Sequence, residues 1–285
     1  MKIRGGLIAA KIIEKLKKQK RPDKILAAVL VGENPQSKSF LRQKELMAKE
    51  LGIVFQLFQL PDSILEDVLI KEIKRISADE EIGGLIIQLP LPPHFNRDKA
   101  LSAVDPKKDV DALTSESRQF VDPLPVAVVK DILSSIHFPL SSKSVAVVGR
   151  GFLVGKPVAD YFREKCKELI VFHSKSDLKD LKKADLVITG AGKAGLIKPE
   201  MLKEGAGVID FGYSFAAQIN ADQDADSRRK ISGDFDSSNV NGQMPARQSL
   251  GDGGSNVSFY TPTPGGTGPI LVAEIFKNFY KLQQK

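Results

Sequence analysis

The chain has few of the residues that build disulfides and zinc sites. Its 285 residues include one cysteine, Cys166, and three histidines. A single cysteine excludes an internal disulfide and is typical of a protein in a reducing compartment, so we expect a cytoplasmic location. Three scattered histidines and one cysteine also argue against a dedicated zinc site.

Long apolar runs and internal repeats are missing as well. No apolar stretch approaches the roughly 18 residues that a membrane-spanning helix needs, so no membrane partner is expected. The first twenty residues are basic and amphipathic, as in some targeting peptides. They contain Glu14 and no small-residue cleavage site, and therefore favour a first structural helix.

Basic residues exceed acidic ones, with 42 Lys and Arg against 35 Asp and Glu and a net charge of +7. Such an excess can indicate nucleic acid binding. The lysines, however, are spread over many predicted helices and form no aromatic–basic cluster. We therefore expect anionic small molecules, and no nucleic acid, as partners.

Apolar runs alternate with amphipathic segments in the first part of the chain. This alternation predicts an α/β fold with a parallel sheet and right-handed crossovers. The predicted helices cover residues 7–19, 35–51 and 63–76, and the predicted strands cover 24–32, 53–60 and 84–89.

The same alternation restarts after residue 117, which predicts a second α/β domain. Its strands are expected to form a parallel sheet built of βα units. This part has a predicted helix over residues 124–136 and predicted strands over 143–149, 168–172, 184–190 and 207–212, and a closing helix is predicted over 270–282.

One charged residue, Lys44, lies on the apolar side of the predicted helix 35–51, at about 100° per residue. Ser37 lies on the same side. A buried amine loses hydration, which favours its neutral form, and it can then give and take a proton near neutral pH. The alternative is that Lys44 extends along its four-carbon stem into water. The apolar arc consists of Phe40, Leu41, Met47, Ala48 and Leu51.

Polar side chains follow the third predicted strand. The strand stops at Gln88 because prolines follow, and the carboxyl edge of an open α/β sheet is where ligands bind. An ordinary strand-end amide is the alternative. Further on, Asp109 and Asp111 flank one valine and would point in opposite directions in an extended chain. We expect one of them to cap a turn and the other to face a ligand.

A glycine-rich turn follows the predicted strand 143–149. Gly149, Gly151 and Gly155 form the pattern G-x-G-x-x-x-G, one residue longer than the usual dinucleotide fingerprint. The turn stands between a strand and a helix whose first amides can hold a phosphate. This context predicts a nucleotide site.

The residues around this turn favour NADP over NAD. An NAD site commonly has an acidic residue at the end of the second strand. Here the strand 168–172 is followed by His173, Ser174 and Lys175, which suit a phosphate. Arg150 in the turn adds a planar, permanently charged guanidinium.

The C-terminal third contains a polar stretch, 214–258, and a proline- and glycine-rich segment. Within the stretch, Gly233–Asp236 is expected to be ordered and 237–258 to form a long loop. Thr261–Pro269 combines rigid and permissive residues. It predicts either an unusual backbone path or a stiff linker.

Together, these segments resemble the bifunctional methylenetetrahydrofolate dehydrogenase/methenyltetrahydrofolate cyclohydrolase family, from about Val31 to the C-terminal helix. The resemblance implies a catalytic folate-binding domain over 1–117 with a returning helix 269–285, an NADP-binding Rossmann-type domain over 118–268, a cleft between them, and a homodimer. The motifs that carry it are VGENPQSKSFLRQK, QLPLP, DPKKDVDA, VVGRGFLVGKP, HSKS, GAGKAG, GVIDFG, GDFD and TPTPGGTGP.

The resemblance also implies two reactions and assigns residues to them. NADP would take a hydride from 5,10-methylenetetrahydrofolate, and water would then open the methenyl product to 10-formyltetrahydrofolate. The catalytic residues would be Lys44, Gln88 and Asp111. The substrate would contact Ser37, Phe40, Pro264, Gly265 and Gly266, and the cofactor would contact Gly149, Arg150, Gly151, Gly155 and Ser174.

The chain departs from the family pattern at several places, among them two near Lys44 and the predicted active site. Phe40 stands where the family usually has tyrosine, and residues 122–125 replace the usual Pro-Cys-Thr-Pro. Loss of a hydroxyl beside Lys44 is expected to affect hydrolysis more than hydride transfer. The alternatives are therefore a member that keeps one activity, a non-catalytic folate- or nucleotide-binding protein, and another two-domain NADP dehydrogenase.

Overall fold

The computed structural model describes residues 1–216, 230–237, 240 and 257–284, so residues 238–239 and 241–256 of the predicted loop lie outside it. The chain divides into two compact units, which we call the three-stranded unit (residues 9–127 and 271–285) and the five-stranded unit (residues 1–8 and 128–270). None of the helices in these described ranges is long and apolar enough to cross a membrane.

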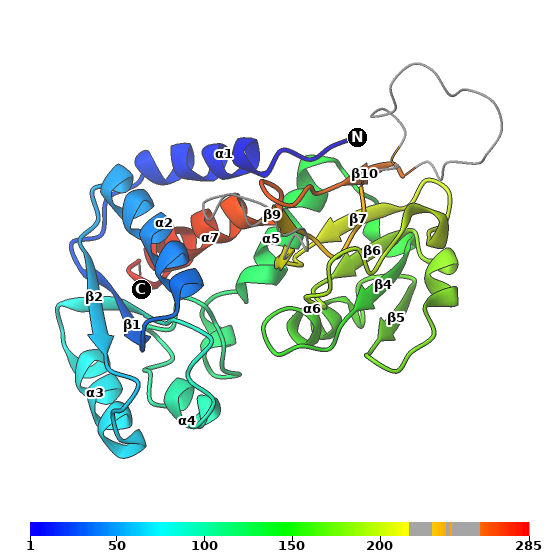
Figure 1. The fold of residues 1–285 in the computed structure, drawn as a ribbon. Helices are drawn as coiled ribbons and strands as arrows, with labels where there is room; N and C mark the ends of the chain where they lie inside the picture. Colours follow the sequence, from blue (N-terminus) through cyan, green and yellow to red (C-terminus); the bar gives the residue numbers. More distant parts are fainter. Residues whose placement is uncertain (217–229, 238–239, 241–256, 285) are drawn as a thin grey trace, which may run out of the picture. The chain divides into compact units, whose positions relative to one another are not determined.

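The three-stranded unit is built on a parallel sheet in the order β2-β1-β3, of which Figure 1 labels β1 and β2. The central strand is apolar along its whole length, as expected of a strand that is covered on both faces. Its strands are β1 (Ile25–Val31), β2 (Phe55–Leu60) and β3 (Ile82–Ile87), and its helices include α2 (Pro35–Leu51), α3 (Glu66–Ala78) and α4 (Arg97–Ser102).

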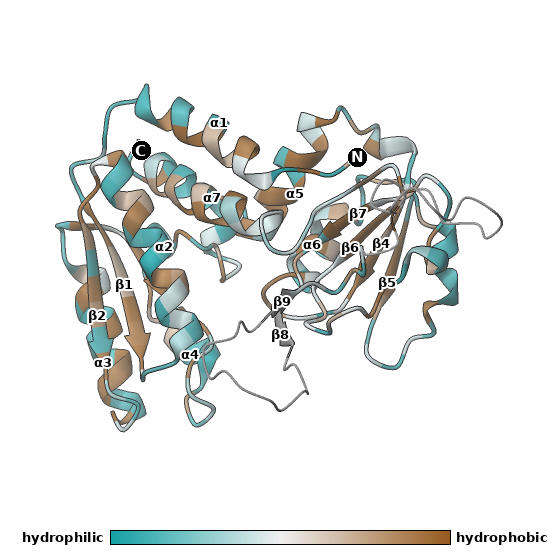
Figure 2. Ribbon diagram, turned by 45° about the horizontal axis from the view of Figure 1, so that its top comes forward, coloured by the Kyte–Doolittle hydropathy of each residue, from teal (hydrophilic) through white to brown (hydrophobic). Residues whose placement is uncertain are grey.

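The five-stranded unit is also a parallel sheet, in the order β10-β7-β6-β4-β5. Figure 2 shows that apolar residues concentrate in the strands of this sheet. Its strands are β4 (Ser144–Val148), β5 (Glu168–Phe172), β6 (Leu186–Thr189), β7 (Gly207–Asp210) and β10 (Phe259–Tyr260), and its complete helix is α6 (Gly155–Phe162).

Three helices contribute residues to both units: α1 (Gly5–Lys17), α5 (Leu124–Ser135) and α7 (Thr267–Leu282). The fold class predicted from the sequence is confirmed. The division at residues 117/118 and 268/269 differs from the structural units, which assign residues 1–8 to the five-stranded unit and 118–127 to the three-stranded unit. As a division by function, it stays a prediction.

A short antiparallel pair was not predicted. β8 (Ser214–Ala216) pairs with β9 (Lys230–Ser232) within the polar stretch 214–258, before the predicted loop 237–258. Three-residue strands give too short a pattern for period-two alternation to be recognised. The expected order at Gly233–Asp236 agrees with the burial of Asp234 and Phe235.

Helix α2 is defined at both ends by its own sequence. The Asn34 side chain accepts a hydrogen bond from the Ser37 amide at 3.0 Å, and Pro35 occupies the first turn, where no amide partner is needed. Gly52 ends the helix with φ at 69°, a conformation that favours glycine. These two caps fix which residues α2 presents to the sheet.

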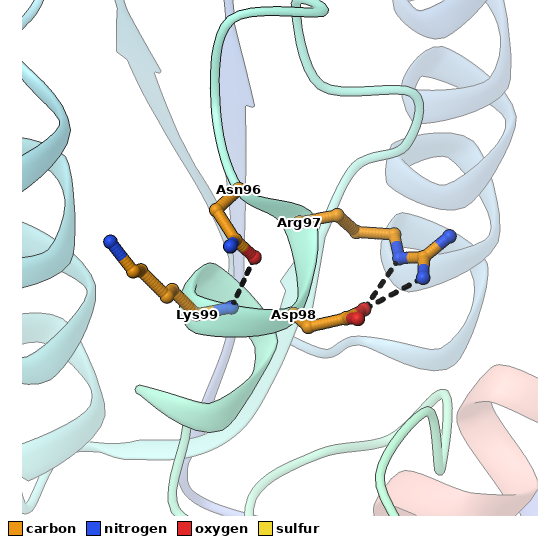
Figure 3. A network of polar contacts seen from close by, with 4 residues as sticks. All are labelled: Asn96, Arg97, Asp98 and Lys99. Carbon is orange, nitrogen blue, oxygen red and sulfur yellow. Dashed lines mark hydrogen bonds and ion pairs between the residues drawn. The ribbon is translucent and has the colours of Figure 1, made fainter.

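Polar contacts at the start of α4 attach it to α3. The Asn96 side chain accepts from the Lys99 amide at 3.1 Å, and Arg97 pairs with Asp98 (Figure 3). Glu66, the first residue of α3, accepts from the Asn96 amide and from Lys99 Nζ. α3 begins there rather than at Ser63, because acidic residues favour the positive end of a helix.

Asn278 ties α7 to the segment around residue 111. Its buried side chain donates to the carbonyl oxygens of Val110 and Asp122, at 2.8 and 3.0 Å. We expect Asn278→Leu to lower the free energy of unfolding by about 2–3 kcal/mol, because two carbonyl groups lose their donor. Urea titration followed by circular dichroism measures this, with the exposed Lys281→Leu as control. Equal stability of the two variants would contradict the anchoring role.

Candidate active site

Lys44 lies on the buried side of α2. Leu41 and Ala48, one turn before and one turn after it, are buried, as the helical pattern predicts. The amine does not extend into water: Nζ donates a hydrogen bond to Gln88 Oε1 at 2.9 Å. The charged side chain that stood out in the sequence is therefore paired with the polar residue at the end of β3.

Contacts with Val29 and Leu89 fix the orientation of Gln88 independently of the lysine. It directly follows β3, is only 7% exposed, and its amide bonds to the carbonyl of Val29 in the neighbouring strand at 2.9 Å. Its side-chain Nε2 donates to the carbonyl oxygen of Leu89 at 2.7 Å. Because the nitrogen end is used in this way, the oxygen end is turned toward Lys44.

Burial shifts the proton affinity of both ionisable groups in this site. Desolvation lowers the pKa of Lys44, and the negative charge of Asp111 opposes this shift. Desolvation raises the pKa of Asp111 to about 6; Lys44 opposes this rise and Asp109 adds to it. Both groups can therefore change protonation closer to neutral pH than they do in water.

Asp109 and Asp111 have different surroundings. The Asp109 carboxylate accepts from the amides of Asp111 and Leu113 and from Ser117 Oγ, at 3.1, 2.9 and 2.6 Å. Within the described ranges, no hydrogen bond ends on the Asp111 carboxylate. Asp109 is thus the residue that holds the turn, which leaves the Asp111 carboxylate for a ligand.

Two further predicted substrate residues share α2 with Lys44. Ser37 is 1% exposed, and its hydroxyl has no hydrogen-bond partner among the described residues. Phe40 is half-buried, one turn before Lys44. A buried hydroxyl without a partner is costly, and it suits a group that is completed by a ligand.

The geometry of the turn after β4 requires glycine at two of the three glycine positions of the motif. Gly149 has φ at 98°, and a Cβ on Gly155 would lie 1.8 Å from the carbonyl oxygen of Gly149. Gly155 therefore lets α6 approach the strand closely. A Cβ on Gly151 would meet nothing within 4 Å, so packing does not require glycine there.

The predicted phosphate-reading residues follow neighbouring strands. Val148 of β4 and Phe172 of β5 are register partners, so Arg150 and Ser174 each lie two residues beyond the same edge of the sheet. Both are exposed. No side chain caps the amino end of α6, which leaves that end available to an anion.

The segment Thr261–Pro269 follows a specific path and is not a linker. Gly265 has φ at 93°, and its carbonyl oxygen accepts from the Gly5 amide at 3.0 Å. A Cβ on Gly5 would lie 1.6 Å from the carbonyl oxygen of Gly266. Pro264, Gly265 and Gly266 belong to the five-stranded unit, whereas Lys44, Gln88, Asp111, Ser37 and Phe40 belong to the three-stranded unit.

Sequence reasoning gave no role to two buried aspartates of the five-stranded unit, Asp210 and Asp234. Asp210 accepts from the amides of Gly212 and Phe235, at 2.6 and 3.0 Å. Burial raises its pKa to about 7 against the effect of these bonds, and the charge of Asp234 adds to the rise. The signal in the sequence was an aspartate at the end of an apolar strand, GVIDFG, and an isolated GDFD.

Family models match both parts of the chain. The description "Tetrahydrofolate dehydrogenase/cyclohydrolase, catalytic domain" matches residues 3–111, and "Tetrahydrofolate dehydrogenase/cyclohydrolase, NAD(P)-binding domain" matches residues 123–285. The Bifunctional protein FolD of Lactobacillus delbrueckii subsp. bulgaricus is 32% identical over 269 residues, which is 91% of this chain and 87% of that protein. That of Sulfurovum sp. is 34% identical over 284 residues, 95% and 92% respectively.

Solved structures agree with the sequence relatives. The Campylobacter jejuni FolD methylenetetrahydrofolate dehydrogenase/cyclohydrolase superposes with a TM-score of 0.86 at 28% identity, covering 100% of this chain and 98% of that one. The Trypanosoma brucei FolD enzyme, complexed with NADP cofactor and inhibitor, gives a TM-score of 0.85 at 26% identity, covering 100% and 97%. The chain therefore belongs to the tetrahydrofolate dehydrogenase/cyclohydrolase family.

Proposed function

We propose that this chain uses NADP to oxidise 5,10-methylenetetrahydrofolate to 5,10-methenyltetrahydrofolate and hydrolyses that product to 10-formyltetrahydrofolate. The observation that carries the proposal is the partly buried hydrogen bond from Lys44 to Gln88, with the Asp111 charge acting on the same amine. Lys44 is the proton-transfer group and Asp111 the anion for the pterin, and both lie in the part of the chain that matches the catalytic-domain model. The glycine turn supplies the nucleotide site in the other.

The residues of the five-stranded unit fit NADP. The missing Cβ of Gly155 lets the start of α6 approach the strand, so backbone amides are available to the pyrophosphate. We assign the 2′-phosphate to Arg150 and Ser174. NADP supplies a hydride acceptor, and the chain contributes binding, orientation and exclusion of water.

In the three-stranded unit, Asp111 would hold the pterin. An ionised carboxylate accepts two parallel hydrogen bonds from the N–C–NH₂ edge of the ring. Phe40 would pack against the ring face, and Ser37 would gain a hydrogen-bond partner. Pro264, Gly265 and Gly266 are further substrate contacts that we propose.

The hydrolytic step needs a proton carrier, and Lys44 would serve. Neutral Lys44 takes a proton from the water whose oxygen bonds to the one-carbon bridge. The resulting ammonium donates to Gln88 Oε1 and then protonates N5 as the bond from the bridge carbon to N5 breaks. The hydroxyl group on the bridge carbon loses its proton to solvent as the carbonyl forms, so the carbon stays on N10 as a formyl group. One proton is released overall, and the lysine returns to its neutral form.

A second candidate is an enzyme with dehydrogenase activity and weak hydrolysis. Phe40 favours it, since a phenyl ring offers no hydroxyl to the amine one helical turn away. A non-catalytic binding protein is the third alternative. Spectrophotometric assay of NADPH formation and of methenyl hydrolysis on one preparation separates all three.

The homodimer and the cytoplasmic location also remain part of the proposal. The location is supported by the single cysteine, which suits a reducing compartment. The substrates we propose are anionic folate derivatives, in keeping with the net charge of +7.

Replacing Lys44 tests the proton-transfer role. We expect Lys44→Met to lower the hydrolysis rate by about 10²-fold or more, because no group then carries the proton. NADP affinity should stay unchanged, and Lys49→Met, an exposed lysine on the same helix, should behave as wild type in both assays. A parallel loss of NADP affinity in Lys44→Met would make the residue structural.

The pKa of Asp111, raised to about 6, predicts how folate binding depends on pH. Binding needs the carboxylate, so affinity should be full above this pKa and fall as the pH drops below it, roughly tenfold by pH 5. Fluorescence titration with a folate analogue measures this. Asp111→Asn should bind weakly with a flat profile, and an equal slope in both proteins would assign the titration to the ligand.

Arg150→Ala tests the choice of cofactor. Loss of a charge-assisted hydrogen bond should weaken NADP by roughly 1.5–3 kcal/mol and leave NAD nearly unaffected. Calorimetric titration of both nucleotides provides the comparison. The control is Arg163→Ala, an exposed arginine just beyond the far end of α6. Equal weakening of NADP and NAD would contradict the assignment.

A further inference from the structure

The strand order of the five-stranded unit reverses beside β4. The chain passes from β4 to β5 on one side and then to β6 on the other (Figure 1). Ligands of open α/β sheets bind at such a switch point, outside the carboxyl ends of the strands. One wall of this point is the glycine turn 149–154, and the other is the loop 190–195 that follows β6.

These two walls are in direct contact. A Cβ on Gly149 would lie 3.2 Å from the carbonyl oxygen of Gly190 and 3.3 Å from the Ala191 nitrogen. A Cβ on Gly190 would lie 2.7 Å from Val154 Cγ1. The position of the loop 190–195 therefore sets the space beside the glycine turn.

The loop sequence, Gly-Ala-Gly-Lys-Ala-Gly, does little to define its own conformation. Gly192 and Gly195 have φ at 67° and 64°, and a Cβ on either residue would meet no heavy atom of the described chain within 4 Å. A glycine-rich loop can populate many conformations, so contacts with residues outside the loop must stabilise one of them.

The Asp234 carboxylate makes this selection. It is 0% exposed and accepts hydrogen bonds from the loop and from the end of β6. Oδ2 accepts from Thr189 Oγ1 at 2.8 Å, from the Ala191 amide at 2.6 Å and from the Gly192 amide at 3.3 Å; Oδ1 accepts from the Lys193 amide at 2.7 Å. Hydrogen bonds to an ionised acceptor are stronger than neutral ones.

The segment that carries Asp234 is attached independently of its side chain. The carbonyl of Gly233 accepts from the Gly195 amide at 3.0 Å, and that of Asp234 accepts from the Ile197 amide at 2.9 Å. The Asp236 amide donates to the Ile197 carbonyl at 2.9 Å. Removing the carboxylate therefore frees residues 190–193 while these backbone bonds remain.

We propose that Asp234 is a positioning residue of the nucleotide site: its carboxylate holds residues 190–193 in the conformation that receives the nicotinamide half of NADP. The inference rests on the proposed function, because it assumes that NADP occupies the switch point. Both carboxylate oxygens of Asp234 accept hydrogen bonds from residues 189–193, so it acts through the loop.

The test compares two ligands on the Asp234→Asn variant. An amide keeps one acceptor oxygen but turns an NH₂ group toward the remaining donors, so the loop loses its fixed conformation. If the competent fraction falls to about one tenth, the Kd for NADP rises about tenfold. The Kd for 2′,5′-ADP, which lacks the nicotinamide half, should stay at the wild-type value. A purely structural role would weaken both ligands alike.

Hydrogen exchange of the apoprotein gives a second readout that needs no cofactor. The amides of Ala191 and Lys193 should lose protection in Asp234→Asn, while that of Ile197 keeps it. The control is Asp185→Asn, at the opposite edge of the sheet, where the carboxylate accepts from the Ser144 amide at 2.9 Å. It should leave both Kd values and the loop amides unchanged.

The outcomes separate the two proposals. Wild-type protein that fails to bind NADP would overturn the proposed function. Wild-type binding with an unchanged NADP Kd in Asp234→Asn, or with full protection of the loop amides, would overturn the positioning role alone. An equal effect of Asp185→Asn on NADP would assign the change to general destabilisation and would likewise overturn it.

Discussion

The hydrogen bond between Lys44 and Gln88 is the constraint on which the candidate site depends. An amine removed from water must be paired or neutral, because an isolated buried charge is costly. Gln88 gives the Lys44 amine one neutral hydrogen-bond acceptor. The negative charge of Asp111 favours the protonated amine electrostatically, without an ion-pair contact. These two contributions offset the desolvation only in part, so the pKa of Lys44 stays lowered. A close ion pair would instead raise it.

Parallel strands explain why the polar residues gather at particular edges. In the three-stranded unit, Gln88 follows β3 and is bonded to β1 through the Val29 carbonyl. In the five-stranded unit, the glycine turn follows β4 and Asp210 ends β7. Parallel strands bring their carboxyl ends to one edge, so residues far apart in the sequence become neighbours there.

Much of the fold and of the candidate site could be predicted from the sequence wherever the signal is a local residue pattern. The helical period placed Lys44 on the buried face of α2, and apolar runs, or alternation in the case of β2, located every strand of the two parallel sheets except β10. A two-residue strand such as Phe259–Tyr260 has no period to detect. The choice between Asp109 and Asp111 needed the turn geometry, because both carboxylates fit the same sequence pattern.

Long-range side-chain contacts were beyond the reach of sequence reasoning. Asp234 meets donors some forty residues earlier in the chain, and no periodicity links such positions. The glycine motif overstated the need for one glycine. Gly151 belongs to the motif, yet only Gly149 and Gly155 are required by the backbone conformation or by close packing. A motif therefore identifies a turn, whereas coordinates show which of its residues the turn needs.

Hydrogen-bond partners distinguish the buried aspartates better than burial does. Asp109 and Asp234 are surrounded by donors from their own turn or loop, and each carboxylate fixes a backbone conformation. The Asp111 carboxylate receives no such bond in the described ranges, and desolvation raises its pKa to about 6. A carboxylate that the fold leaves without donors is destabilised until a ligand supplies them, and the pterin edge that we propose as its partner would do so. The same physical cost that disfavours Asp111 in the free protein therefore favours it as a binding group.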